Sequence, residues 1–184
     1  MSSPEKGPTR RVVLAGLGLA ALAATLAGCQ VRPLYADRAG AGPEVTKELA
    51  AVAIKFDEPR DNDDRRRLQA LRNDLIFAFT GGGGAPEPRY ELRLFLSTRS
   101  AELGIEQYQD VPAARMIAIT ATFTLTDLTT RSVVMSGTSF ANASYDFSSQ
   151  RFANIRAERD AENRAVDTLA RNIQARVATA LATR

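Results

Sequence analysis

The sequence of 184 residues contains no histidine, no tryptophan and only one cysteine, Cys29. Catalytic triads and zinc sets that need imidazole are excluded because the chain has no imidazole. A single cysteine cannot form an intrachain disulfide. The absence of tryptophan also removes the strongest aromatic anchor that an interface could use. We therefore predict no metal site and no cofactor.

The chain also lacks a concentrated excess of charge. Lysine and arginine total 24 against 21 aspartate and glutamate residues, which gives a net charge of +3. Much of this excess lies at the N-terminus, in Lys6, Arg10 and Arg11. A surface that follows nucleic-acid phosphates needs a dense group of cations. We predict no nucleic-acid partner.

Without histidine, a hydrolase would have to use paired carboxylates. The candidate pairs are Glu102 with Glu106 and Asp57 with Glu58, and neither pair stands in a recognisable catalytic context. Both pairs are interpreted as solvated loop charges. The sequence therefore predicts no catalytic residues and no enzymatic activity.

The N-terminus has the composition of an export signal. A polar, basic stretch is followed by 15 uncharged, mostly apolar residues, Val12 to Leu26. That length suits a signal-peptide core and is short of the roughly 20 residues that span a bilayer as a helix. Thr9 to Leu14 loosely resembles a twin-arginine motif, although an ordinary basic region is the simpler interpretation, so the export route stays open.

The stretch Leu26-Ala27-Gly28-Cys29 resembles the lipobox of bacterial lipoproteins. The resemblance implies that residues 1–28 are a cleaved signal peptide and that an acylated Cys29 becomes the first residue of the mature chain. The alternative is a buried free cysteine at the end of a core helix. Gln30, where many lipoproteins retained at the inner membrane carry aspartate, points to the periplasmic face of the outer membrane. Acyl chains would hold the protein there without a spanning helix.

The region after Cys29 consists of a predicted tether followed by one domain. Residues 29–48 contain several Pro and Gly residues and no sustained periodicity, which predicts the lipid anchor and a tether. Beyond them, alternating apolar residues indicate strands, and apolar residues at steps of three and four indicate helices. The expected elements are a strand at 49–56, a helix from 61 or 62 to 80, a strand at 89–100, a hairpin at 115–145 with its turn near 127–131, and a helix at 152–181.

This order, β-α-β-β-β-α, predicts an α+β fold for residues 49–184. The expected architecture is a two-layer sandwich, a four-stranded mixed sheet with two helices on one face. The other face should be solvated or covered by a partner. Thr120, Thr122, Thr124 and Thr126 are expected on that solvent side of their strand.

Three features together resemble the LptE family of lipopolysaccharide-assembly lipoproteins. They are the lipobox followed by "CQVRPLYA", the order of the elements, and the final stretch "SYDFSSQRFANIRAERDAENRAVDTLARNI". The resemblance implies a non-enzymatic protein that plugs and helps assemble the outer-membrane β-barrel LptD and assists delivery of lipopolysaccharide to the outer leaflet. The alternative is the auxiliary lipoprotein of a phospholipid-transport ABC system.

Lipopolysaccharide binding would need cations that face its phosphates, and arginine has the fork of donors that matches phosphate. Because the predicted hairpin turn lies at one end of the sheet, the loop before Arg115 and the segment after the hairpin meet at the other end. Arg99, Arg115 and Arg151 are therefore candidates for an anion-facing edge, with Gln107 and Tyr108 nearby. The alternative is that all three arginines are solvated at strand ends.

Overall fold

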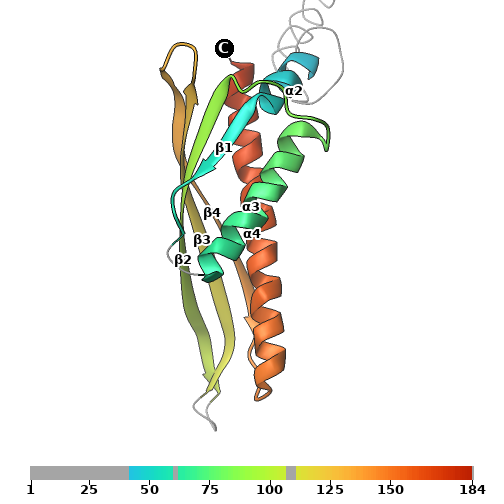
Figure 1. The fold of residues 1–184 in the computed structure, drawn as a ribbon. Helices are drawn as coiled ribbons and strands as arrows, with labels where there is room; N and C mark the ends of the chain where they lie inside the picture. Colours follow the sequence, from blue (N-terminus) through green and yellow to red (C-terminus); the bar gives the residue numbers. More distant parts are fainter. Residues whose placement is uncertain (1–41, 60–61, 107–110, 184) are drawn as a thin grey trace, which may run out of the picture. The chain divides into compact units, whose positions relative to one another are not determined.

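The computed structural model describes residues 42–59, 62–106 and 111–183, which all belong to one compact unit. These residues form three helices and one sheet, and the helices lie beside the sheet (Figure 1). The elements in chain order are α2 (Gly42–Ala50), β1 (Val52–Phe56), α3 (Asn62–Thr80), β2 (Tyr90–Glu106), β3 (Val111–Asp127), β4 (Val133–Asp146) and α4 (Arg151–Ala182). The predicted signal peptide and most of the predicted tether, Cys29 included, lie outside the described residues.

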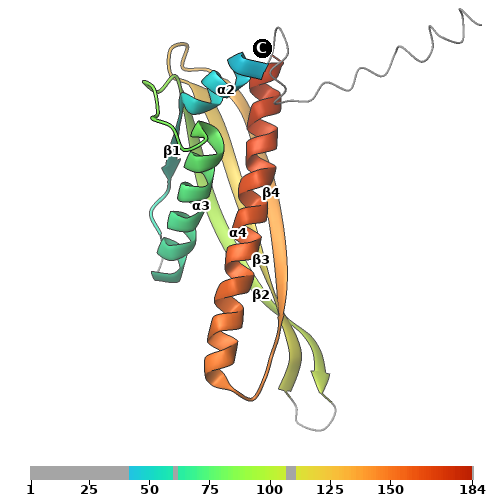
Figure 2. The ribbon, with the colours of Figure 1, turned by 90° about the vertical axis from the view of Figure 1, so that its right-hand side faces the viewer.

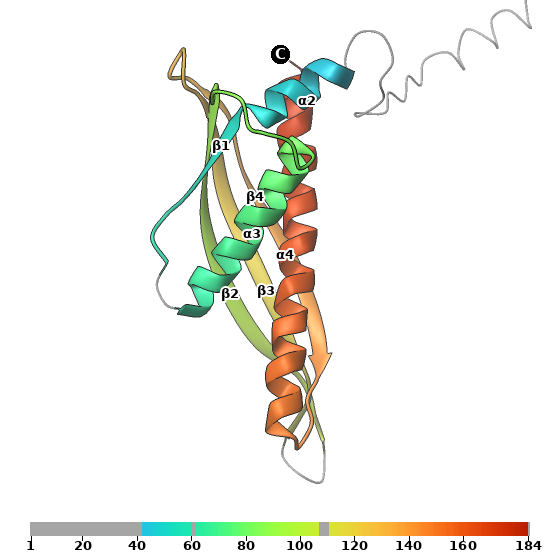
Figure 3. The same cartoon turned by 45° about the vertical axis from the view of Figure 1, so that its right-hand side comes forward.

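The four strands form one mixed sheet in the order β1-β2-β3-β4. β1 runs parallel to β2, and the other two neighbouring pairs are antiparallel. The helices all lie on one face of this sheet, with α3 and α4 side by side over the strands (Figures 2 and 3). The predicted α+β class and mixed four-stranded sheet are confirmed.

The core lies between the sheet and the helix layer because apolar residues follow the period of each element. On β2, Tyr90, Leu92 and Leu94 are buried, and they alternate with side chains on the other face. On α4, Leu169 and Ile173 belong to a buried stripe at steps of four. Each such large apolar side chain contributes about 1.5–3 kcal/mol when it is fully buried. The helices therefore cover the face on which the apolar residues gather.

Two predictions about the start of the domain are corrected. The tether was expected to reach residue 48 and the first strand to begin at Leu49, but α2 occupies Gly42–Ala50 and β1 starts at Val52. Val45 and Leu49, four residues apart, are buried on the side of α2 that packs against α3 and α4. The layer thus has one helix more than predicted.

α4 is the longest element, with 32 residues, and it runs the length of the sheet. Exposed pairs on its outer side include Asp160 with Arg164, whose Oδ2 and Nε lie 2.8 Å apart, and Asp167 with Arg171. None of the helices in the described residues is long and apolar enough to cross a membrane.

A buried group of charges joins α3 to α4. Glu162 of α4 forms ion pairs with Arg66 and Arg67 of α3, and Arg67 also donates to Asp64 Oδ1 at 2.8 Å. Glu162 and Arg67 are 6% and 9% exposed. Removing one partner of such a buried pair leaves an uncompensated charge, which costs more than the intact pair contributes.

We expect Glu162→Gln to lower the free energy of unfolding by about 3–5 kcal/mol, because both guanidinium groups lose their buried counter-charge. Denaturant unfolding of the purified protein measures this change. Asp160→Asn is the control, since it breaks an exposed pair on the same helix and should cost less than about 1 kcal/mol. Equal losses of unfolding free energy in the two variants would contradict the conclusion that the ion pairs of Glu162 hold α3 and α4 together.

Two acidic residues, one on each of these helices, interact electrostatically. Burial raises the pKa of Asp74 on α3 above its ordinary value, and the nearby negative charge of Asp167 on α4 raises it further. The folded chain therefore holds the Asp74 proton to a higher pH than the unfolded chain does. Between the two pKa values, the free energy of unfolding falls as pH rises.

Asp74→Asn should therefore stabilise the fold at neutral pH and remove this part of the pH dependence. Thermal unfolding at pH 4 and pH 7 checks both effects. We expect the gain in Tm to be larger at pH 7, where the wild-type carboxylate is charged. A gain that is equal at the two pH values would show that the charge of Asp74 is not its cause.

Candidate functional site

The face of the sheet opposite the helices is not covered by any described element. On β3, Thr120, Thr122, Thr124 and Thr126 point to this open face, because they alternate with buried residues of the core. The prediction that this threonine row lies on the outer side of the strand is confirmed. β4 continues the polar surface with four exposed side chains, Ser136, Thr138, Asn142 and Ser144.

Two phenylalanines interrupt this polar face. Phe140 of β4 is 71% exposed and stands opposite Thr120, and Phe95 of β2 is 42% exposed and stands opposite Thr122. The two rings therefore lie on either side of the threonine row, near the middle of the sheet. Exposed aromatic side chains on an otherwise polar surface are typical anchors of protein interfaces.

The prediction from sequence missed both phenylalanines, although a signal was present. Leu92, Leu94 and Leu96 fix the phase of β2, and that phase places Phe95 on the wet side. An aromatic residue at a strand position that faces solvent is the signal that would have identified Phe95.

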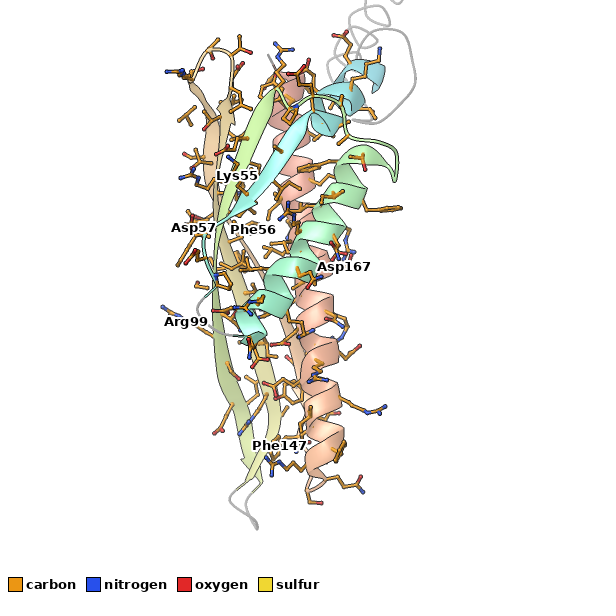
Figure 4. All side chains as sticks on the ribbon, in the orientation of Figure 1. Lys55, Phe56, Asp57, Arg99, Phe147 and Asp167 are labelled. Atoms are coloured by element: carbon orange, nitrogen blue, oxygen red, sulfur yellow. The ribbon has the colours of Figure 1, made fainter. Side chains whose placement is uncertain are left out.

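Charged residues of the open face lie toward β1. Lys55 Nζ is 2.7 Å from Glu91 Oε2, and Arg93 lies 3.4 Å from the other carboxylate oxygen. The hydrogen bond from Lys55 holds the pKa of Glu91 below its ordinary value. Arg99 extends from the same face, away from the helices (Figure 4), and pairs with no carboxylate among the described residues.

Arg115 lies on the face that the helices cover, at the end of the sheet where the chain passes from β2 to β3. Its Nη2 donates to Glu102 Oε1 at 3.0 Å, and its guanidinium carbon lies 4.6 Å from the centre of the Phe147 ring. Figure 4 shows Phe147 at this end, beside the first turns of α4. Tyr145 is the register partner of Arg115 on β4, and burial raises the pKa of its hydroxyl.

The three predicted arginines are therefore not brought to one surface. Arg115 and Arg151 lie at the same end of the sheet, since α4 begins at Arg151, where β4 has just ended. Arg99 belongs to the other face. The two neighbours predicted for them, Gln107 and Tyr108, lie outside the described residues.

The structure also shows where carboxylates from the two candidate catalytic pairs lie. Glu102 is held by Arg115, and Asp57 and Glu58 line a small cavity of ≈ 20 Å³ between the loop after β1, α3 and β2. That volume holds about one water molecule. Within the described residues, no group of three or more acidic or sulfur ligands is arranged to hold a metal ion.

Comparison with known proteins agrees with this fold. The family model described as "LptE: Lipopolysaccharide-assembly" matches residues 49–177. A lipoprotein structure from Caulobacter crescentus is similar at 25% identity and a TM-score of 0.56, over 76% of this chain and 96% of that one. Rare lipoprotein B from Shewanella oneidensis shares the fold at 11% identity and a TM-score of 0.52, over 70% of this chain and 93% of that one. No curated protein matches the sequence.

The fold, a mixed sheet covered on one face by helices, is thus shared with these lipoprotein structures. The family match extends over most of the chain, and the chain belongs to the LptE family of lipopolysaccharide-assembly proteins.

Proposed function

We propose that this protein is an outer-membrane lipoprotein that plugs and helps assemble an LptD-type β-barrel and assists delivery of lipopolysaccharide to the outer leaflet. In this proposal an acylated Cys29 anchors it at the periplasmic face, and it has no enzymatic activity. The observation that carries the proposal is the family match over residues 49–177. The uncovered, hydroxyl-rich face of the sheet supports it.

The chemistry of the open face suits the inside of a barrel. The lumen of an outer-membrane barrel is polar, whereas its outer wall is apolar. Threonine, serine and asparagine side chains can donate and accept hydrogen bonds, so they can exchange water for polar groups of a lumen wall at little cost. Phe140 and Phe95 would then supply the apolar anchors of a largely polar contact.

Contact of lipopolysaccharide with Arg99, Arg115 and Arg151 stays a prediction. The geometry favours Arg99 and Arg151, which are exposed and make no ion pair with a described residue. Arg115 is the weaker candidate, since Glu102 already neutralises it and Phe147 covers one side of its guanidinium group. A phosphate would have to displace Glu102 from Arg115 before it could bind there.

The test is co-purification from detergent-solubilised outer membranes. We expect the tagged wild-type chain to bring down a large β-barrel protein in about equal amount, and Phe140→Asp to reduce that yield about tenfold, because an anchor worth about 1.4 kcal/mol or more is lost. Phe77→Asp is the matched control. Phe77 is 68% exposed, close to the 71% of Phe140, but it lies on α3 in the helix layer.

One outcome would count against the proposed function, and another against the contact surface that it uses. If no barrel co-purifies with the wild-type chain and components of a phospholipid transporter do, the alternative function replaces it. If the barrel co-purifies equally with both aspartate variants, the plug function stands but the open face is not the contact surface. Thermal unfolding of each variant shows whether a lost yield reflects a lost fold.

The anchor is tested separately by the mass of the mature protein. Cleavage before Cys29 followed by acylation should give a chain that begins at residue 29 and is heavier than its sequence by the mass of its acyl groups. Cys29→Ser should leave an uncleaved precursor without added lipid. An unmodified full-length chain in wild-type cells would rule out the lipoprotein assignment.

A further inference from the structure

The two edges of the sheet differ in whether side chains form hydrogen bonds with their outward-facing backbone groups. At the β4 edge, two arginines of α4 reach over the strand. Arg164 Nη2 donates to the carbonyl oxygen of Ser144 at 3.0 Å, and Arg176 Nη1 donates to that of Thr138 at 2.8 Å. Gly137 leaves room for Arg176, since a Cβ at that position would lie 3.3 Å from its Nη1. These side chains occupy carbonyls that an added strand would need.

The β1 edge has no such cover in the described part of the chain. The carbonyl of Ala51 accepts from the amide of Tyr90, and the amide of Asp57 donates to Leu94, so the odd-numbered residues of β1 face β2. Backbone groups alternate in direction along a strand. The amides and carbonyls of Val52, Ile54 and Phe56 therefore point away from the sheet, on the side where no strand of the described residues follows.

A groove follows this open edge between β1 and α3. One part, with a volume of ≈ 380 Å³, is lined by residues 50–55 of the chain and, across from them, by apolar groups that include Ile76, Phe79 and Pro86. A second part, of ≈ 490 Å³, continues past Phe56 toward the start of α3. β1 and α3, whose positions Figure 3 shows, are the two elements that line most of it. The β1 wall presents backbone groups, and the α3 wall presents side chains.

Arg72 of α3 lines both parts of the groove. It is exposed and forms no ion pair with a residue that the structure describes. Asp57 and Glu58 line only the second part of the groove, so in the first part the charged groups are Arg72 and Lys55, and Arg72 would attract an occupant that carries a carboxylate.

We propose that the β1 edge receives an extended polypeptide segment as a fifth strand of the sheet. The occupant is a segment of the barrel partner with apolar side chains facing α3 and an acidic side chain opposite Arg72, and this identity rests on the proposed function. The segment comes from a loop or a terminal extension, because the strands of a closed barrel offer no free edge. The five residues of β1 span about 17 Å, enough for a short added strand.

The open backbone groups select a polypeptide over an acyl chain for this groove. An acyl chain could fill the apolar space, but it would bury the amides and carbonyls of Val52, Ile54 and Phe56 without hydrogen bonds, which is unfavourable. A strand satisfies each of them. The asymmetry of the two edges then directs strand addition to β1, because Arg164 and Arg176 obstruct it at β4.

Hydrogen–deuterium exchange at single-residue resolution tests the proposal. The complex purified with its barrel is compared with the mature chain alone in the same detergent. We expect exchange at the amides of Val52, Ile54 and Phe56 to be about tenfold or more slower in the complex, while exchange at Ala53 and Lys55 changes little because those amides already face β2. This alternation distinguishes an added strand from simple covering of the surface.

Ile76→Glu and Ile155→Glu form a matched pair of variants. Ile76 is 42% exposed and lines the groove, whereas Ile155 is 40% exposed on α4, away from it. Ile76→Glu should reduce the protection of the three amides in the complex, and Ile155→Glu should leave it unchanged. Arg72→Glu provides a second groove variant if Ile76→Glu fails to fold.

Unchanged exchange at these amides in a complex that contains the barrel would overturn the inference and leave the proposed function intact. Protection at Leu96 and Thr98 instead would overturn it too, because it would place the added strand on β2 beyond the end of β1. If no barrel co-purifies, it is the proposed function that fails.

Discussion

Alternation of mainly apolar and mainly polar residues along β2, β3 and β4 determines which face of the sheet the helices cover. Leucine, isoleucine and phenylalanine side chains gather on one side, and threonine and serine gather on the other. A surface of the first kind must be buried, whereas a surface of the second kind is stable in water. The one-sided helix layer and the bare hydroxyl-rich face follow from this alternation, whereas Phe95 and Phe140 depart from it.

The sequence predicted the order and class of the elements because α3, α4 and the long strands have clear periods. The prediction failed at the start of the domain. There, "LAAVAIKF" mixes alanine with larger apolar residues, a pattern that fits a strand as well as the end of a helix. Leu49 belongs to α2, and only Val52, Ile54 and Phe56 follow the strand pattern. Short apolar runs are ambiguous in this way, and the packing of Val45 and Leu49 against the other helices decides the outcome.

Less of the candidate site could be predicted from the sequence. The phase of each strand was sufficient to place Arg99 and Arg115 on opposite faces, because Ile117 points to the core and Arg115 shares its parity. The buried pair of Arg67 and Glu162 was not predictable in this way, since 95 residues separate the two and only the crossing of α3 and α4 brings them together. Neither the arginines that cover the β4 edge nor the groove beside β1 has a signature in the sequence.

The unequal lengths of the two large helices have a consequence for how the domain opens. α3 has 19 residues and α4 has 32, so α3 extends about 28 Å and α4 about 48 Å. Near the β3–β4 turn the sheet is backed by α2, α3 and α4, whereas its far end is backed by the first turns of α4 alone. Local unfolding is easiest where fewest apolar contacts must break. The end that carries Arg115 and Phe147 should therefore open before the half that all three helices cover.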